Sequence, residues 1–113
     1  MHARPKARNE SGNSALLFAA LGDETRLRLA LRLSSDGPLS ITRLTAGTRV
    51  TRQAITKHLR VMDRAGLVHS QRCGRERIWH LDQQRLQTAR RYLDAISRQW
   101  DDALGRLREF VEA

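Results

Sequence analysis

The chain has few of the residues that stabilise secreted or membrane proteins. Its 113 residues include one cysteine, and aromatic side chains make up only 4% of them. Because Cys73 has no second cysteine to pair with, an intrachain disulfide and the cross-linked class of small secreted domains are excluded. No apolar run approaches the roughly 20 residues that span a bilayer, and the basic N-terminus lacks an apolar signal core. We therefore expect no membrane partner and a cytoplasmic location.

The scarcity of aromatics means that the core must be built mainly from Leu, Ile, Val and Ala. A chain of 113 residues is too short for two independent cores, so we expect one domain over residues 13–113. Residues 1–12 have no apolar periodicity and predict a disordered basic tail, either inert or a minor-groove arm. A small domain often gains stability from a partner, which already favours a dimer.

The charge of +9 is concentrated in one part of the chain. Residues 48–80 hold eight basic residues against two acidic ones, a net charge of +6, whereas residues 81–113 hold six of each sign. A solvated surface normally mixes the two signs, as the last segment does. A basic excess confined to one segment favours a face that binds a polyanion, with nucleic acid as the first candidate.

Apolar periodicity and capping residues predict helices in the first half of the chain. A first helix is expected from Asn13 or Ser14 to Leu21, and Asp23 is a candidate N-cap for the second. The inward positions expected on the second helix are Leu27, Ala30, Leu31 and Leu33. After the turn at 36–38, Ser40 is expected to cap a short third helix that Gly47 closes.

A fourth helix is expected at about 51–65, with Thr51 as its N-cap and Gly66 as its end. Its inward positions are Ala54, Ile55, Leu59 and Met62. A turn of three or four residues connects it to the third helix. Two helices joined in this way are typical of a helix-turn-helix, in which the second helix enters the DNA major groove.

The period then changes to that of strands. Residues 67–72 and 76–81 are two strand-like runs, and 73–75 form the tip between them. Alternation places Trp79 and Leu81 on one face, toward the core. The expected wing therefore covers about 67–81, and the fold class is mainly α with a small β-hairpin (α+β): a winged helix-turn-helix.

A long C-terminal helix is expected at about 83–111. Its apolar residues recur in steps of three and four, from Leu86 to Val111. This stripe is longer than a core of this size can cover, and its spacing suits packing of one helix on another. We expect a shared dimer interface, with part of the stripe used by the core; the alternative is one helix lying across its own domain.

The exposed side of the fourth helix carries the residue types that recognise bases. Near its N-terminus this side presents Arg52, Gln53, Thr56 and Lys57. Arg and Lys donate to guanine, Gln pairs bidentately with adenine, and a Thr methyl contacts thymine. The hairpin arginines Arg72, Arg75 and Arg77 suit flanking phosphates or a narrow minor groove.

Three runs in order resemble the ArsR family of bacterial winged helix-turn-helix regulators: LGDETRLRLALRL, SITRLTAGTRVTRQAITKHLRVMDRAGLV and GRERIWHL. The resemblance covers roughly residues 14–81, and the last helix is consistent with it. It implies that Arg52, Gln53, Thr56 and Lys57 contact double-stranded DNA with the wing arginines in support.

The same resemblance implies a repressor acting as a symmetric homodimer built by the first and last helices. The interface residues that we expect are Leu16, Leu93, Ile96, Trp100, Leu104 and Leu107. Two recognition helices about one DNA turn apart, roughly 34 Å, then require a pseudo-palindromic operator.

The metal sites common in this family have no counterpart here. The short third helix, SITRLTAG, has no cysteine, and the last helix has no histidine. Tight zinc or soft-metal sites need converging Cys or His ligands, so we expect neither a metal nor another cofactor. We expect His58 to be packed or to face DNA, and His69 and His80 to form a cross-strand pair.

Other functions remain as alternatives. Cys73, beside three arginines, allows a thiol-based, redox-responsive repressor, although a small residue at a turn is the simpler interpretation. A nucleoid-type protein would bind DNA without sequence preference and would not need Gln53 and Thr56. A winged helix that binds only protein would not need a basic recognition face. No catalytic residues are expected, since no phosphate loop or activated nucleophile occurs in the sequence.

Overall fold

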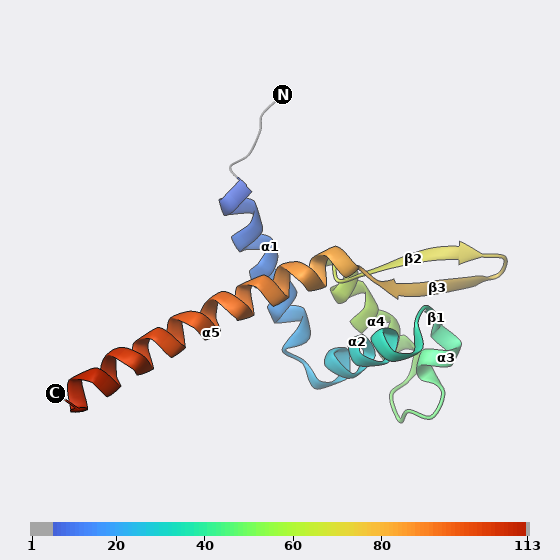
Figure 1. Cartoon of the computed structure of the whole chain (residues 1–113). Helices are drawn as coiled ribbons and strands as arrows, with labels where there is room; N and C mark the ends of the chain where they lie inside the picture. The colour runs from blue at the N-terminus through green and yellow to red at the C-terminus, as the bar shows by residue number, and fades with distance from the viewer. Residues whose placement is uncertain (1–5, 113) are drawn as a thin grey trace.

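A computed structural model describes the backbone of residues 6–112 and the side chains of residues 14–112. The elements in chain order are α1 (Lys6–Leu21), α2 (Glu24–Asp36), β1 (Leu39–Ser40), α3 (Ile41–Thr45), α4 (Arg52–Arg64), β2 (Val68–Cys73), β3 (Glu76–Leu81) and α5 (Gln83–Glu112). Figure 1 shows a body of short helices, a hairpin extending from one end and α5 projecting from the other. This is the winged helix-turn-helix that the sequence predicts.

Local capping fixes the starts of three helices as expected. The side chains of Asp23, Ser40 and Thr51 accept hydrogen bonds from the backbone N–H groups of Arg26, Arg43 and Ala54. Each cap satisfies a donor that the first helical turn leaves free. Gly66 ends α4 with φ +76°, a conformation in which a side chain would be strained. The wing therefore begins where the sequence places it.

The core is aliphatic and centres on α4. Leu17 from α1, Leu44 from α3 and Leu59 and Met62 from α4 are fully buried. Trp79 and Leu81 of β3 close the core from the sheet side, as alternation predicts. On α4 the buried residues are Ile55, Leu59 and Met62, while Ala54 is half-buried. One side of α4 is thus held against the body, and the other is left outside.

The sheet has three strands in the order β1-β3-β2 rather than the two that we expected. Leu39 pairs with Trp79 and Ser40 with Ile78, both antiparallel. Two residues are too few to show alternation, which is why the sequence gives no sign of β1. The strand ties the start of the helix-turn-helix to the base of the wing.

Two predictions for the N-terminal half are wrong. On α2 the buried residues are Leu29, Ala30 and Leu33, whereas Leu27 and Leu31 are 44% and 60% exposed. The alternation of Leu with Arg in this helix allows two apolar faces: the inward positions predicted for Ala30 and Leu33 are confirmed, and those predicted for Leu27 and Leu31 are wrong. In addition, α1 begins at Lys6, so residues 6–12 continue the helix and are not part of a disordered tail; residues 1–5 lie outside the described part of the chain.

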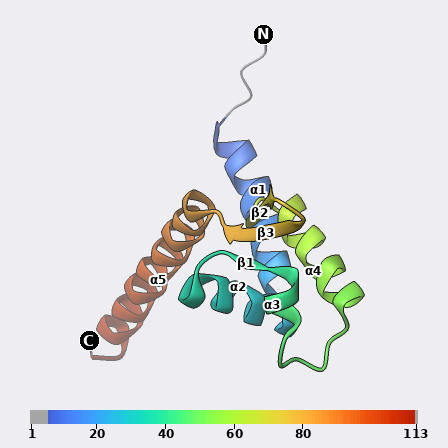
Figure 2. The same ribbon diagram turned by 90° about the vertical axis from the view of Figure 1, so that its right-hand side faces the viewer.

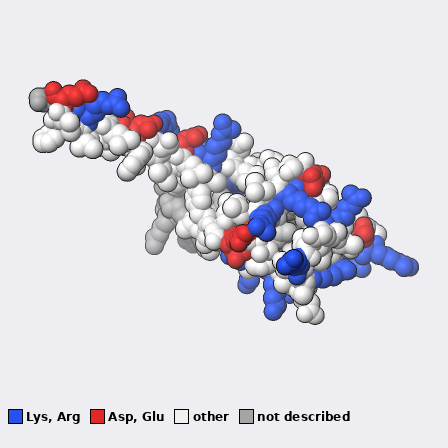
Figure 3. Space-filling view, turned by 90° about the horizontal axis from the view of Figure 1, so that it is seen from below, with Lys and Arg blue, Asp and Glu red and all other residues white. Residues whose placement is uncertain are grey.

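The long helix α5 does not lie across its own domain. Leu86 packs against the core and Ala89 is buried, and no later α5 residue up to Glu112 is buried. Figure 2 shows α5 and α4 on opposite sides of the body. Along the projecting part of α5, Figure 3 shows charged side chains on one edge and uncharged ones on the other. No helix within residues 6–112 is long and apolar enough to cross a membrane.

Candidate nucleic-acid interface

The first turn of α2 holds α4 from behind. Arg26 donates from Nε to the Ala20 carbonyl at 2.7 Å, and its Nη1 lies 3.3 Å from His58 Nδ1. His58 is a residue of α4, so α4 is tied to the end of α1 through this guanidinium. His58 is therefore packed, which is one of the two roles that we expected for it.

Asp23 completes this support. Its carboxylate caps α2 through the Arg26 backbone N–H at 3.0 Å and lies 3.8 Å from His58 Nδ1. The hydrogen bond from the Arg26 backbone, followed by the charges of Arg26 and His58, holds the pKa of the Asp23 carboxyl below its usual value despite some desolvation. The LGDETR segment thus acts as a clamp that positions α4.

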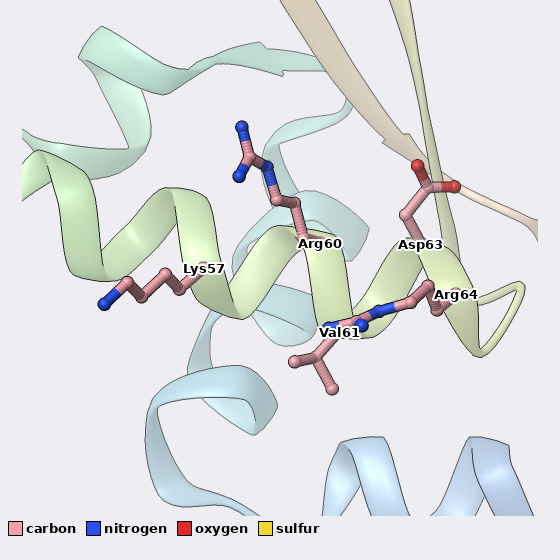
Figure 4. A pocket seen from close by; sticks show the side chains of 5 residues that line it. All are labelled: Lys57, Arg60, Val61, Asp63 and Arg64. Atoms are coloured by element: carbon pink, nitrogen blue, oxygen red, sulfur yellow. The ribbon is translucent and has the colours of Figure 1, made fainter.

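The outer face of α4 is open along its length. Arg52, Gln53 and Lys57 are exposed, and Thr56 is half-buried. These four residues and Arg60 line a shallow depression of about 360 Å³. A second depression, of about 620 Å³, continues along the helix and is lined by Lys57, Arg60, Val61, Asp63 and Arg64 (Figure 4). The four predicted residues therefore share one surface.

Arg60 also belongs to this surface, although the sequence-based prediction of the base-contacting residues did not include it. It follows Thr56 by four residues and Lys57 by three, which is the spacing of neighbours on one helix face. Arg64 continues the same series, and Figure 4 shows Lys57, Arg60 and Arg64 along α4. The spacing of three and four residues could have identified Arg60, but the predicted base-contacting residues were confined to the N-terminal part of the helix.

The wing places its arginines away from the core. Residues 71–77 are all exposed, and Arg72 is paired directly with Arg77 across the two strands. Like charges opposite one another destabilise a hairpin. Arg77 donates to Ser70 Oγ at 2.9 Å, but a hydroxyl group carries no charge that would neutralise the guanidinium. Arg75 lies in the tight turn after Gly74, whose φ is +64°. The two guanidinium groups of Arg72 and Arg77 therefore repel each other in the free protein, and a bound polyanion would relieve this repulsion.

At the base of the wing, His69 joins the hairpin to α5. Its Nε2 lies 2.7 Å from Asp82 Oδ2, and its ring centroid lies 5.9 Å from that of His80. The two histidines are partners in the β2–β3 register, which confirms the expected cross-strand pair. Within the described part of the chain, no three His, Cys, Asp or Glu side chains converge as a metal site would need.

Asp82 contacts both the hairpin and the start of α5, so we expect it to contribute to the free energy of unfolding. It also accepts the Arg85 backbone N–H at 3.0 Å, which caps the first turn of α5. Partial burial alone would raise the pKa of this carboxyl, but the bonds from Arg85 and His69 outweigh it and lower the pKa. Its contribution is therefore present above the unfolded pKa of about 3.9 and is lost as pH falls through the lowered value.

We expect Asp82→Ala to reduce the free energy of unfolding by about 1 kcal/mol at pH 7, as loss of a helix cap does. The reduction should shrink in acid, where the wild-type carboxyl is also protonated. Urea unfolding at pH 7 and at pH 2, well below the ordinary pKa of an aspartate, measures both values, with Asp94→Ala, an exposed position on α5, as control. An equal loss at the two pH values would show that the carboxylate charge has no part in the effect.

Comparison with known proteins agrees with this geometry. A family model described as a helix-turn-helix domain matches residues 21–71. The HTH-type transcriptional regulator Rv2034 of Mycobacterium tuberculosis is 34% identical over 96 residues, covering 85% of this chain and 86% of that protein. The uncharacterized HTH-type transcriptional regulator YuzN of Bacillus subtilis is 42% identical over 74 residues, covering 60% and 80%.

Among solved structures, an ArsR-like transcriptional regulator from Rhodococcus sp. RHA1 superposes with a TM-score of 0.75. It is 33% identical, and the match covers 90% of this chain and 95% of that one. This chain belongs to the ArsR family of helix-turn-helix transcriptional regulators. The helix-turn-helix match covers α2, α3 and α4, and the exposed basic side chains described above lie on α4 and on the β2–β3 hairpin.

Proposed function

We propose that this ArsR-family chain is a sequence-specific repressor that binds a pseudo-palindromic operator in double-stranded DNA as a homodimer. The observation that supports it best is the outer face of α4, where Arg52, Gln53, Thr56 and Lys57 lie together and unobstructed. A protein that bound only phosphates would need cations there, but it would have no use for a glutamine between them.

Gln53 and Thr56 favour readout of bases. An exposed Gln side chain can donate to and accept from adenine in the major groove. The Thr56 hydroxyl donates to the Arg52 carbonyl at 2.9 Å, so its proton is already used by the helix. What Thr56 then offers a base is its methyl group, which suits the thymine methyl. The pair thus favours A·T base pairs within each half-site.

The remaining basic groups suit the DNA backbone. Arg60 and Arg64 continue the α4 surface, while Arg72, Arg75 and Arg77 follow the hairpin. Neutralising phosphates releases counterions, so each contact steepens the fall of affinity with salt. These contacts supply affinity and register but no sequence preference.

A homodimer is supported by the exposed apolar residues. Leu16, Leu93, Ile96, Trp100, Leu104 and Leu107 are all between 44% and 65% exposed. A monomeric soluble protein rarely leaves such a contiguous patch uncovered. A symmetric pair of recognition helices then matches a pseudo-palindrome, and occupation of that site blocks transcription without any further activity of the protein.

Two classes of variant separate this proposal from a nucleoid-type protein. Gln53→Ala and Arg52→Ala should each weaken binding to a preferred duplex by about 1–3 kcal/mol and relax the preference at particular base pairs. Arg75→Ala should weaken binding to all duplexes alike and reduce the salt slope. Fluorescence anisotropy against matched and substituted duplexes at several salt concentrations measures both effects. If Gln53→Ala and Arg52→Ala weaken all sequences equally, α4 does not specify the operator.

Redox control through Cys73 is a second candidate, and its support is exposure. Cys73 is free and exposed at the end of β2, beside the arginines of the wing. Oxidation there would weaken the contact between wing and DNA. If peroxide changes operator binding of the parent protein and leaves Cys73→Ser unaffected, the thiol is the sensor; equal behaviour of the two proteins rejects this candidate.

A further inference from the structure

The large exposed apolar side chains are confined to three helices. Among the described side chains, seven lie on α5 between Leu93 and Val111, one is Leu16 on α1, and two are Leu27 and Leu31 on α2. The outer faces of α3 and α4 have no large apolar residue of this kind. The uncovered apolar surface is therefore kept away from the DNA-binding elements, as expected for a surface that another protein molecule covers.

Leu27 and Leu31 form a face that the chain itself does not use. They are one helical turn apart, so their side chains are neighbours on α2. The same helix serves the core with Leu29, Ala30 and Leu33. Its outer face is thus a second, separate apolar surface. Two leucines are too few to form a docking site alone, and both remain exposed in the single chain.

The distal part of α5, from Trp100 to Val111, carries a longer series of exposed apolar residues and, unlike the α2 face, is not part of the compact body. It lies beyond Ala89, the last buried residue of the helix, and projects from the body (Figure 1). From Ala89 to Glu112 the helix runs about 35 Å at 1.5 Å per residue. Trp100, Leu107 and Val111 are 65%, 58% and 73% exposed. A projecting arm of this length can reach only another molecule.

Symmetry connects the two surfaces. In a two-fold dimer every contact occurs twice, because the same patch is used on both subunits. The proximal residues Leu16, Leu93 and Ile96 are exposed on α1 and α5, two helices that contact each other, and they suit the region around the axis. A stable interface buries about 800 Å² on each partner, more than these three partly exposed side chains supply. Each arm must therefore continue past the axis onto the body of the other subunit.

We infer that the distal arm of α5, Trp100–Val111, lies across the Leu27–Leu31 face of α2 in a second copy of this chain. This inference rests on the proposed homodimer and adds the contact that completes it. Outside α1 and α5, Leu27 and Leu31 are the described large apolar residues that remain for the arm to cover. The contact is reciprocal, so two arms and two α2 faces are covered at once.

The contact has a consequence for DNA binding. Helix α2 packs against α4, and Arg26 of α2 contacts His58 of α4. An arm clamped on the outer face of α2 therefore holds the recognition helix of the other subunit from behind. The distance between the two recognition helices is then fixed by the arms as well as by the contacts near the axis.

Cysteine cross-linking tests the contact directly. In a Cys73→Ser background, a Leu31→Cys copy is mixed with copies carrying Leu104→Cys, Leu107→Cys or Val111→Cys and is oxidised after subunit exchange. We expect a disulfide-linked heterodimer with at least one of the three. Thr42→Cys, at an exposed position on α3, should give none with the same partners.

Sedimentation of charged variants provides the second measurement. Leu31→Glu and Leu107→Glu should each raise the dimer dissociation constant at least tenfold, while Thr42→Glu leaves it unchanged; circular dichroism checks that each variant is folded. A dimer that forms no cross-link at any of the three positions and tolerates Leu31→Glu would overturn the arm contact and leave the homodimer intact. A wild-type protein that stays monomeric at all concentrations would overturn both.

Discussion

Ile96→Glu should make the protein monomeric at concentrations where the wild type is a dimer, and its affinity for a full operator should fall at least 100-fold. Ile96 is 58% exposed, so the folded monomer accommodates the charge at little cost. In the dimer the same carboxylate would be buried without a partner, which is strongly unfavourable. Linking two half-sites raises affinity by about 10²–10⁴, and a monomer forfeits that gain.

Sedimentation velocity and binding to a full and a half operator measure these two effects. Arg98→Glu is the control, because Arg98 is exposed and, two residues after Ile96, lies on the opposite side of the helix from it. Affinity for a single half-site should be nearly the same in all three proteins. An Ile96→Glu protein that remains dimeric and binds the full operator normally would place the interface elsewhere.

Leu59→Ala should reduce the free energy of unfolding by about 2–5 kcal/mol, the cost of a cavity in a close-packed core. Leu59 is fully buried on the inner face of α4. A domain of this size has a total stability of about 5–15 kcal/mol, so the recognition helix would lose much of its support. Urea unfolding followed by circular dichroism gives the value.

The control for Leu59→Ala is its neighbour Arg60, which is exposed. Arg60→Ala should change stability by less than about 0.5 kcal/mol, as surface substitutions usually do, while weakening DNA binding. If Leu59→Ala were as stable as Arg60→Ala, the inner and outer faces of α4 would be wrongly assigned.

Features that depend on local sequence could be predicted in advance. The caps at Asp23, Ser40 and Thr51, the end of α4 at Gly66 and the hairpin around Gly74 each need only a few neighbouring residues. The inward side of α4 was also predictable, because Ile55, Leu59 and Met62 have a clear helical spacing among polar neighbours. These elements place the recognition helix and the wing, which is why the DNA-binding surface could be expected from sequence.

Features that depend on the rest of the fold could not be predicted in the same way. On α2 the leucines recur on two faces, and only the position of α4 decides that Leu29 and Leu33 are buried while Leu27 and Leu31 are not. Strand β1 exists because β3 offers it a free edge, not because of a pattern in Leu39 and Ser40. The bridge from His69 to Asp82 joins residues that are 13 apart and meet only after the hairpin closes.

Selection of bound fragments from random double-stranded DNA at raised salt tests the central claim most directly. Raised salt weakens phosphate contacts and leaves base contacts to decide which fragments remain. We predict enrichment of one inverted repeat whose half-sites are centred about one helical turn, roughly 34 Å, apart. The same selection with Gln53→Ala should lose preference at specific positions within each half-site. Recovery of fragments with no common sequence would contradict the account, because the exposed face of α4 would then bind DNA without reading it.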